Sequence, residues 1–587
     1  MIVTRIRRRH LAGGLIGGLA LLAAACSGVP TSTDPVSAPT RIEREVPVAT
    51  NTQLPVARAG MSPPAVVNDF IKASAQSGGR HDAAKAFLTP DAQRVWRDNA
   101  GATIGTVQYI GSFDIKAQTV DVQLTEVGQV DAAGVFTATP SVSNYKTVKF
   151  HLRRDAKTKR WQISQLPGPG VILSPANFNS IYTPINLYFL NRGQDPRVVP
   201  DPRYFDVPPL SLASAVAQAL VNGPSARLRP AVDTAIPPKA RLRQGVVATS
   251  PLQIDLRGIG GMTQTQLHGM AAQFVWTMDQ VRPILHVERL QILSEGTVDS
   301  IKGFGTQPLS KDSWLSYDPE AMPPGAATSY LIQDGDVIRG SDGQRVPGAS
   351  GLELSSVAVS VDGQYIAGVA RNGKGATLYV GKYAGRLRAV LHQAQLTTPT
   401  WLPDDQLLLV SNRRDLLRFS AASPSGSPAS YTNALASIPG VRSLRVSLDG
   451  ARVAVVSLDG TVYTGVVGST APIVGLAQLV DAPSDATQVA WSGATELTIL
   501  APDPNLSLPM AVWTAEVDSI GGKRSSLPTS GLPDSPVALA AAPNQYTIVQ
   551  PKNQDTPFYY NSDDETWSGL PSNDGFPLQG SAPTYPG

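Results

Sequence analysis

Short aspartate turns recur along the C-terminal half of this chain at a nearly constant spacing. Asp362, Asp404 and Asp449 each follow an apolar stretch and precede another, and they stand 42 and 45 residues apart. Two of the three are followed by glycine, and an Asp-Gly pair between two apolar runs is typical of a tight turn that joins two strands. A period of about 40–45 residues is the length of a four-stranded propeller blade. The spacing therefore predicts an all-β propeller over residues 314–570.

The repeated segment has recognisable copies at residues 357–367, 399–409 and 444–454, and a degraded one at 489–497. The copies resemble the Ser-Pro-Asp-Gly units of TolB-type propellers, with Val or Leu in the place of Pro. A region of about 257 residues at this period predicts about six blades, and five or seven stay open. The Pro-, Gly- and Ser-rich stretch 571–587 is expected to be a loose C-terminal tail.

The first 25 residues have the order of an export signal. Basic residues come first, an apolar run over Leu11–Leu22 follows, and three alanines lead into Cys26, the single cysteine of the chain. The run is shorter than the roughly 20 apolar residues of a helix that spans a bilayer. A cysteine directly after small residues resembles a bacterial lipobox. That resemblance implies cleavage before Cys26, a diacylglycerol on its sulfur (S-diacylglycerol cysteine) and an acyl group such as palmitate on its new amine (N-acyl cysteine).

Two questions stay open for this leader. An ordinary secretory signal with a chance cysteine is the alternative, and Ala23 stands where a lipobox more often has Leu or Val. Arg8 and Arg9 resemble part of a twin-arginine signal, so the export route, Sec or twin-arginine, is undecided. Two or three acyl chains hold a protein stably on a membrane. We therefore expect a mature protein anchored at Cys26 to the extracytoplasmic face of the cell membrane, with residues 26–60 as a flexible tether.

The charge of the mature chain is close to zero. The whole sequence has 49 Lys and Arg against 46 Asp and Glu, but four arginines belong to the leader, which leaves a net charge of −1. Nucleic-acid binding therefore has no support from charge. Because Cys26 is the only thiol, a disulfide, a thiolate metal site and a cysteine nucleophile are excluded in the rest of the chain.

Two α+β units are expected between the tether and the propeller. In residues 61–170, Ser62 precedes two prolines and an apolar stripe at helical spacing, which indicates a helix. Apolar and polar residues alternate over 148–152 and 161–165, which indicates two strands. In residues 184–296, a strand over residues 187–190 precedes two helices whose apolar stripes cover 212–220 and 267–278. Further strands are expected near 245–257 and 286–293. The fold class is therefore multidomain, with two α+β domains followed by the propeller.

No catalytic, metal-ligating or cofactor-binding residue stands out in the sequence. The mature histidines are scattered without a His-x-x-x-His pair: His81, His151, His268, His286 and His392. No Gly-x-Ser-x-Gly elbow is present, and the Ser-x-x-Lys set is not found with its partner motifs. The aspartates of the repeats are read as turn corners. We therefore expect a protein that is not an enzyme and has no cofactor.

The segment from 188 to 278 resembles a GerMN domain, a module named from sporulation and germination proteins. The resemblance lies in the order of five short segments: Tyr188–Asn191, Asn222–Pro224, Ala235–Pro237, Gln253–Leu256 and Gln273–Met278. Together with the lipobox, the N-terminal α+β unit and the propeller, this order is similar to the actinobacterial LpqB lipoprotein family. The resemblance implies an accessory role beside a membrane sensor histidine kinase of the MtrB type, whose ectodomain would be the partner.

The sequence thus favours a non-catalytic, membrane-anchored lipoprotein that modulates a two-component sensor kinase in regulation of the cell envelope. The alternative is a protein that binds peptidoglycan or another glycan, or a degenerate envelope hydrolase. A pair of carboxylates about 5–10 Å apart in a cleft would favour the hydrolase. Cell-wall contact is compatible with both hypotheses.

Overall fold

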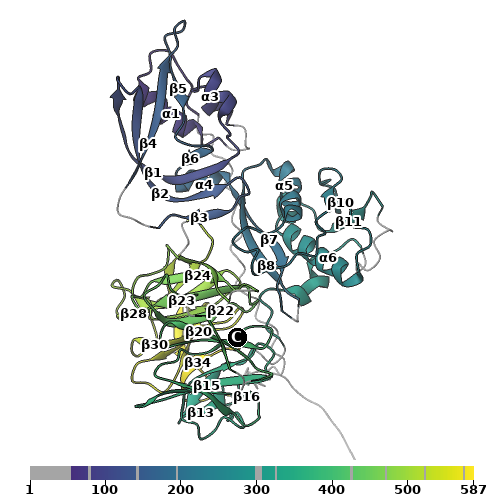
Figure 1. The fold of residues 1–587 in the computed structure, drawn as a ribbon, viewed down its shortest axis with the longest axis vertical. Coiled ribbons are helices and arrows are strands. Elements are labelled where there is room, and N and C mark those ends of the chain that lie inside the picture. The colour runs from purple at the N-terminus through teal and green to yellow at the C-terminus, as the bar shows by residue number, and fades with distance from the viewer. Residues whose placement is uncertain are drawn as a thin grey trace, which may run out of the picture. The chain divides into compact units, whose positions relative to one another are not determined.

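The computed structural model describes most of the chain that follows the tether. The described residues are 54–76, 81–140, 145–193, 196–297, 307–323, 327–423, 427–431, 433–469, 472–520, 524–572 and 575–587. The expected leader, Cys26 and most of the tether lie outside them. The two α+β units and the all-β unit that follows confirm the expected fold class (Figure 1).

The first unit packs short helices against one curved sheet. Its helices are α1 (Pro63–Ala73), α2 (Asp82–Lys85), α3 (Pro90–Val95) and α4 (Pro175–Ile181). Its strands are β1 (Gly101–Asp114), β2 (Thr119–Asp131), β3 (Phe136–Ala138), β4 (Lys146–Arg154), β5 (Trp161–Gln165) and β6 (Val171–Leu173). The sheet order is β5-β4-β2-β1-β6, with β3 paired to β2. The apolar stripe of α1 buries Val66, Val67 and Phe70 against this sheet, as the helical spacing predicts.

The middle unit contains two longer helices and two small sheets. Its elements are β7 (Thr183–Leu190), β8 (Val198–Phe205), α5 (Pro209–Asn222), β9 (Arg241–Leu242), β10 (Leu252–Arg257), α6 (Gln264–Asp279), α7 (Arg282–Leu285) and β11 (Leu290–Ser294). Strands β7 and β8 are antiparallel, whereas β10 and β11 are parallel. Helix α5 ends at Asn222 and is capped by Gly223, whose φ of 94° few other residues adopt. Helix α6 begins with a capping box in which Thr263 and Gln266 cap each other.

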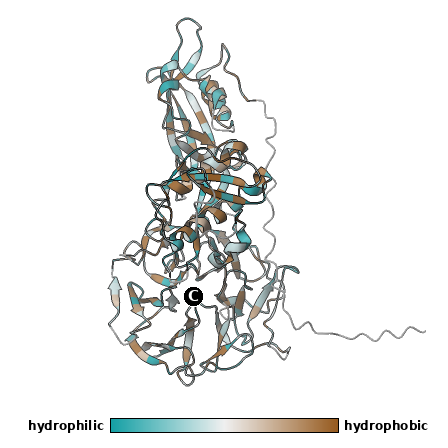
Figure 2. Ribbon diagram, turned by 90° about the vertical axis from the view of Figure 1, so that its right-hand side faces the viewer, coloured by the Kyte–Doolittle hydropathy of each residue, from teal (hydrophilic) through white to brown (hydrophobic). Residues whose placement is uncertain are grey.

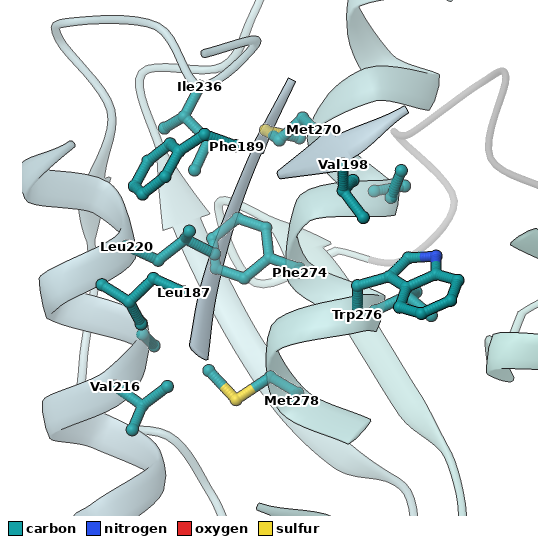
Figure 3. Packing of buried hydrophobic residues seen from close by; sticks show 14 of the residues in the cluster. Leu187, Phe189, Val198, Val216, Leu220, Ile236, Met270, Phe274, Trp276 and Met278 are labelled. Atoms are coloured by element: carbon teal, nitrogen blue, oxygen red, sulfur yellow. The ribbon is translucent and has the colours of Figure 1, made fainter. Parts of the chain in front are cut away.

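Both helices of the middle unit contribute to one apolar core. Phe274 and Met278 of α6 face Leu187 of β7 and Val216 and Leu220 of α5 in this core (Figure 3). All five side chains are buried. The stripe of methionine and aromatic residues that the sequence offers at helical spacing is therefore core and not a ligand site.

The C-terminal unit is a series of small sheets. After the 3-10 helix η1 (Lys311–Tyr317), strand β12 (Tyr330–Gln333) pairs with β13 (Asp336–Arg339) on one side and with β34 (Ser581–Thr584) on the other. Five four-stranded sheets follow: β14 (Leu354–Val359) to β17 (Arg388–Gln393), β18 (Thr400–Trp401) to β21 (Ala429–Tyr431), β22 (Val441–Val446) to β25 (Val474–Gln478), β26 (Gln488–Trp491) to β29 (Ser525–Ser526) and β30 (Pro536–Ala540) to β33 (Thr566–Gly569).

The strands inside these sheets are short and join by tight turns. They are β15 (Tyr365–Asn372), β16 (Gly375–Lys382), β19 (Gln406–Ser411), β20 (Asp415–Ser420), β23 (Arg452–Ser457), β24 (Val462–Val466), β27 (Glu496–Pro502), β28 (Met510–Glu516), β31 (Ile548–Pro551) and β32 (Phe558–Asn561). Gly363 and Gly450 have φ values of 72° and 76°, so the two Asp-Gly turns have the conformation that their sequence indicates. In the C-terminal unit, the described residues form five four-stranded sheets and one three-stranded sheet. The number of blades stays a prediction.

The expectation of a loose tail over 571–587 is wrong for its last residues. Ser581–Thr584 forms β34, which pairs with β12. Tyr585 is buried, and its hydroxyl donates a hydrogen bond to the carbonyl oxygen of Tyr546 at 2.9 Å. Strand β34 also contacts β14, β30 and β31. The C-terminus that follows it is marked in the middle of the C-terminal unit in Figure 2. Composition misled here because a strand of four residues needs few apolar side chains when its partners supply the burial. The strand expected over 245–257 is also shorter, since β10 begins at Leu252.

We expect removal of residues 581–587 to destabilise the C-terminal unit. The truncation takes away β34 and the buried ring of Tyr585, and it leaves one side of β12 unpaired. The loss should be on the order of 3–5 kcal/mol in the free energy of unfolding. Thermal unfolding and limited proteolysis measure it. A chain extended by a short Gly-Ser tail after Gly587 is the control, and a truncated chain as stable as this control would contradict the assignment of β34 as a closing strand.

Candidate functional site at a charged junction

The residue that the sequence singles out most strongly is Cys26. It lies outside the described residues, so its lipidation stays a prediction. None of the described helices is long and apolar enough to cross a membrane. Attachment through Cys26 is therefore argued from the sequence alone.

The aspartates of the repeats are held within their own turns. Asp362 Oδ1 accepts hydrogen bonds from Ser360 Oγ at 2.6 Å and from the Gln364 amide at 2.9 Å. Asp449 Oδ1 accepts in the same way from Ser447 Oγ and from the backbone amide of Ala451. Such contacts fix the turn between two strands. Asp362 and Asp449 therefore stabilise the turns between strands, which is the role that the sequence predicts for them.

The histidines named in the sequence analysis do not form a common site among the described residues. His81 is buried in the first unit, with its Nε2 3.4 Å from Asp206 Oδ2. The Nδ1 of His392 lies 2.9 Å from Thr377 Oγ1 at the surface of the C-terminal unit. Among the residues that the structure describes, no group of three His, Cys, Asp or Glu side chains could hold a metal ion.

The polar groups that do converge lie where the three units meet. Arg452, at the start of β23, is 3% exposed. Its Nη2 donates a hydrogen bond to the carbonyl oxygen of Pro200 in β8 at 2.6 Å and lies 3.5 Å from Asp518 Oδ2. Arg227 of the middle unit forms an ion pair with the same Asp518. The middle and C-terminal units are thus joined by a buried guanidinium that has both a carbonyl and a carboxylate partner.

Strand β8 supplies the next part of this junction. Asp201 and Arg203 are each 4% exposed, and the Nη2 of Arg203 lies 2.7 Å from Asp201 Oδ2. Arg203 Nη1 also donates to the carbonyl oxygen of Ala133 in the first unit at 2.9 Å. Asp201 Oδ2 also accepts a hydrogen bond from the Ser225 amide at 2.7 Å. These partners offset much of the cost of burying both charged groups, although Arg203 Nε is buried without a hydrogen-bond partner among the described residues.

Tyr204 connects all three units through its backbone, its ring and its hydroxyl. Its amide donates to the carbonyl oxygen of Gly134, its ring packs on Phe136 and Phe178, and its hydroxyl accepts from the Ile520 amide at 3.2 Å. Burial raises the pKa of the Tyr204 hydroxyl above its usual value, so this group stays protonated and neutral at physiological pH. A Cβ atom at Gly134, whose φ is 77°, would lie 2.6 Å from the Tyr204 carbonyl oxygen, so only glycine allows this approach.

The cavity at the junction is too small for a substrate. Its volume is about 20 Å³, and its lining residues come from all three units, among them Val135, Asp201, Arg227, Arg452 and Thr464. That volume accepts about one water molecule. Both carboxylates of its lining, Asp201 and Asp518, are already paired with arginine. We interpret the junction as a fixed joint that sets the arrangement of the three units and not as a reaction centre.

Sequence reasoning missed the junction. Arg452 is 252 residues away from Pro200, with which it shares a hydrogen bond, and 66 residues away from Asp518. A pattern of charged residues between prolines, Pro200-Asp201-Pro202-Arg203, was the available local signal for buried polar groups on β8. Nothing in a single sequence links that signal to Asp518.

Three family models match the chain in succession. Residues 56–179 match "Lipoprotein LpqB, N-terminal domain", residues 186–299 match "Sporulation and spore germination", and residues 335–586 match "Lipoprotein LpqB beta-propeller domain". The chain is 28% identical over 606 residues to lipoprotein LpqB of Mycobacterium tuberculosis (strain CDC 1551 / Oshkosh), which covers 97% of this chain and 98% of that protein. It is 27% identical over 579 residues to lipoprotein LpqB of Rhodococcus opacus (strain B4), which covers 92% of each chain.

Solved structures resemble part of the chain at low similarity. TolB from Acinetobacter baumannii matches with a TM-score of 0.33 and 16% identity, over 47% of this chain and 70% of that one. A nidogen/laminin complex chain matches with a TM-score of 0.34 and 7% identity, over 44% of this chain and 97% of that one.

The substitution Arg452→Ala should loosen the junction. It removes the hydrogen bond to Pro200 and takes away one of the two arginines that pair with Asp518. The free energy of unfolding should fall by about 2–4 kcal/mol. We expect a lower melting temperature and faster proteolysis between the middle and C-terminal units. Arg418→Ala is the matched control, since Arg418 forms a partly exposed pair with Asp404 at 3.2 Å and should contribute less than about 1 kcal/mol. Equal effects of the two substitutions would contradict the role of Arg452.

The substitution Asp405→Asn should stabilise the C-terminal unit at neutral pH. Burial, with the negative charges of Asp362 and Asp404, raises the pKa of Asp405 to about 6. Because this value lies above the roughly 3.9 of an unfolded chain, stability from this group is complete below about pH 4 and is lost as the pH rises through about 6. Asparagine stays neutral and also tolerates the φ of 58° at this position.

Thermal unfolding at two pH values tests this expectation. Near pH 7.5 the melting temperature of Asp405→Asn should exceed that of the wild type by about 1–3 °C, and near pH 4 the difference should vanish. Glu288→Gln, a substitution of an exposed acid in the middle unit, is the control and should change little at either pH. A gain that is the same at both pH values would show that charge is not its cause.

Proposed function

We propose that this chain, which belongs to the LpqB lipoprotein family, is a non-catalytic accessory protein that is anchored to the cell membrane at Cys26 and binds the ectodomain of a sensor histidine kinase. Its two named relatives above are lipoproteins that match almost along their full length. The observation that carries the anchored part of the proposal is the position of Cys26, the single cysteine, at the end of an export signal. The kinase partner, of the MtrB type, comes from the family resemblance.

The form of the junction supports a binding role for the folded part. Arg452 and Arg203 each connect two units through buried polar contacts, and Tyr204 connects all three. A fixed arrangement of three units offers a partner one continuous surface and avoids the entropic cost of ordering them on binding. A lipid anchor adds to this by confining both proteins to one membrane surface, which raises their effective concentration.

The cavities support binding over hydrolysis. The junction cavity has its two carboxylates in ion pairs, and the lining of the larger groove described below contains no aspartate or glutamate. A glycosidase needs two carboxylates about 5–10 Å apart that are free to act as acid and base or nucleophile. Binding to peptidoglycan without hydrolysis remains the competing outcome, and sedimentation of the purified protein with peptidoglycan would detect it.

The substitution Cys26→Ala should release the protein from the membrane fraction. Without the thiol, no diacylglycerol can be attached. Even if the leader is retained, its short apolar run binds a bilayer less firmly than two or three acyl chains do. Cell fractionation and mass spectrometry of the mature amino terminus measure the change. Ser27→Ala, which leaves the thiol in place, is the control. A Cys26→Ala protein that sediments with membranes as firmly as the wild type would refute the anchor.

The kinase part of the proposal has its own test. The chain from residue 54 onward, without leader and tether, should bind the isolated ectodomain of the sensor kinase in a pulldown and in a titration calorimeter. The Arg452→Ala protein is the informative variant, because a partner that contacts more than one unit should bind it more weakly. If neither the soluble chain nor the lipidated protein in membranes forms a complex with the kinase, the accessory role is wrong, whatever the outcome for Cys26.

A further inference from the structure

A groove on the C-terminal unit lies at the end that does not contact the middle unit. The turns that follow the inner strands, such as 402–405, 447–451 and 492–495, contact the middle unit or the connection to it: Pro403 lies against Gly193, and the Asp449 carbonyl oxygen accepts a hydrogen bond from Asn191. Strands reverse direction at each turn, so the connections 372–375, 394–399 and 411–415 lie at the opposite end of their sheets. Those connections line the groove.

The groove is large enough for a few side chains of a ligand. Its volume is about 580 Å³, and it spans three neighbouring sheets, β14–β17, β18–β21 and β22–β25. Several of their strands are labelled in Figure 1. This volume lies within the range of roughly 300–1,000 Å³ that is usual for ligand sites. The junction cavity does not approach that range.

Three arginines line this groove, which we call the arginine groove. Arg371, Arg413 and Arg442 are all exposed, and none of them has an ion-pair partner among the described residues. They come from different sheets, and Arg414 lies beside Arg413 on the same turn. The nearby acid Asp459 accepts hydrogen bonds from Ser457 and Thr461 and is used in its own turn. The lining thus has three positive charges without a carboxylate to balance them.

The arginines are held in place by neutral acceptors. Arg371 donates to Ser355 Oγ at 2.7 Å and to the Leu396 carbonyl oxygen at 3.0 Å. Arg442 Nη2 donates to the Leu458 carbonyl oxygen at 3.1 Å, and Arg413 Nε donates to Gln395 Oε1. A guanidinium has five N–H donors, so each side chain keeps donors and its whole charge for a ligand. Arginine pairs with a carboxylate through two parallel hydrogen bonds.

The floor of the groove is apolar. Leu396, Val410 and Val441 line it and are buried below the arginines. Gln395 and Thr398 add an amide and a hydroxyl at the rim. A ligand that matches this surface carries negative charges and apolar groups in alternation, which is a property of a peptide and not of a phosphate polymer. A flat membrane surface does not match it either, because the site is concave and its apolar residues lie below the charges.

We propose that the arginine groove binds an extended acidic peptide segment of a partner protein. Acidic side chains of the segment pair with Arg371, Arg413 and Arg442, and an apolar side chain between them contacts the floor. The proposal stands apart from the kinase partner, since it concerns the chemistry of one groove and is tested with a synthetic probe.

Fluorescence anisotropy with a labelled ten-residue peptide of glutamate and leucine tests the proposal on the chain from residue 54 onward. The wild type should bind the peptide saturably, and affinity should fall as salt rises from about 50 mM to about 500 mM. The triple substitution Arg371→Gln, Arg413→Gln and Arg442→Gln should weaken binding by at least about tenfold. The double substitution Arg413→Gln and Arg442→Gln spares the two hydrogen bonds of Arg371 and should weaken it by about threefold to tenfold.

The matched control is the double substitution Arg386→Gln and Arg388→Gln. Both residues are exposed: Arg386 lies on the β16–β17 connection and Arg388 is the first residue of β17, at the other end of a sheet that borders the groove. It removes the same charge as the first double substitution and should leave affinity within about twofold of the wild type, because long-range charge effects are screened by salt. Equal losses in the two double variants would overturn the proposal, as they would show nonspecific attraction. Thermal unfolding verifies that the variants stay folded.

Further probes separate the other occupants of such a site. A peptide with lysine in place of glutamate should not bind. Inorganic polyphosphate and vesicles with anionic headgroups are the remaining arms. If either binds in a way that depends on the three arginines while the acidic peptide does not bind, the groove has a different ligand class and the proposal is wrong. Absence of peptide binding to the wild type at low salt would overturn it directly.

Discussion

The buried guanidinium of Arg452 is the interaction on which the arrangement of the units depends most. A cation is costly to remove from water, and it is tolerated here because a carbonyl oxygen of the middle unit and a carboxylate of its own unit both face it. The carbonyl partner is available only when the two units are in contact. The buried charge therefore favours one docked arrangement: separation of the units would remove the hydrogen bond to Pro200, whereas apolar contacts alone would tolerate small shifts.

Strand β8 supplies contacts of the middle unit with both of its neighbours. Its backbone and side chains contact the first unit through Arg203 and Tyr204 and the C-terminal unit through Pro200 and Tyr204. One short strand thus fixes the positions of its neighbours on both sides. The proposed accessory role would benefit from such an arrangement, because the other units would help to position a partner that binds one of them. In the same arrangement, the arginine groove lies at the end of the C-terminal unit that faces away from the middle unit. The middle unit therefore does not block access of a ligand to the groove.

The elements that the sequence predicted well depend on local information. Helices α5 and α6 have apolar stripes and end signals within 16 residues, and the Asp-Gly turns are set by a few neighbouring residues. Strand β8 was missed because Pro200 and Pro202 discourage a strand, yet proline is acceptable where one side of a strand has no partner. The junction was missed because its partners are distant in the chain. The arginine groove was missed for the same reason, since its three cations come from three sheets.

Pairing of β12 with β34 also has a kinetic consequence. Tyr330 pairs with Thr584, so the C-terminal unit brings together residues separated by more than 250 positions. Contacts over such distances slow folding, because a long loop must close before they form. For a chain that emerges with its N-terminus first, the sheets in between can assemble early, but β12 waits for the last few residues. Until these residues are available, one edge of β12 stays unpaired and exposed to proteolysis and to pairing with other strands.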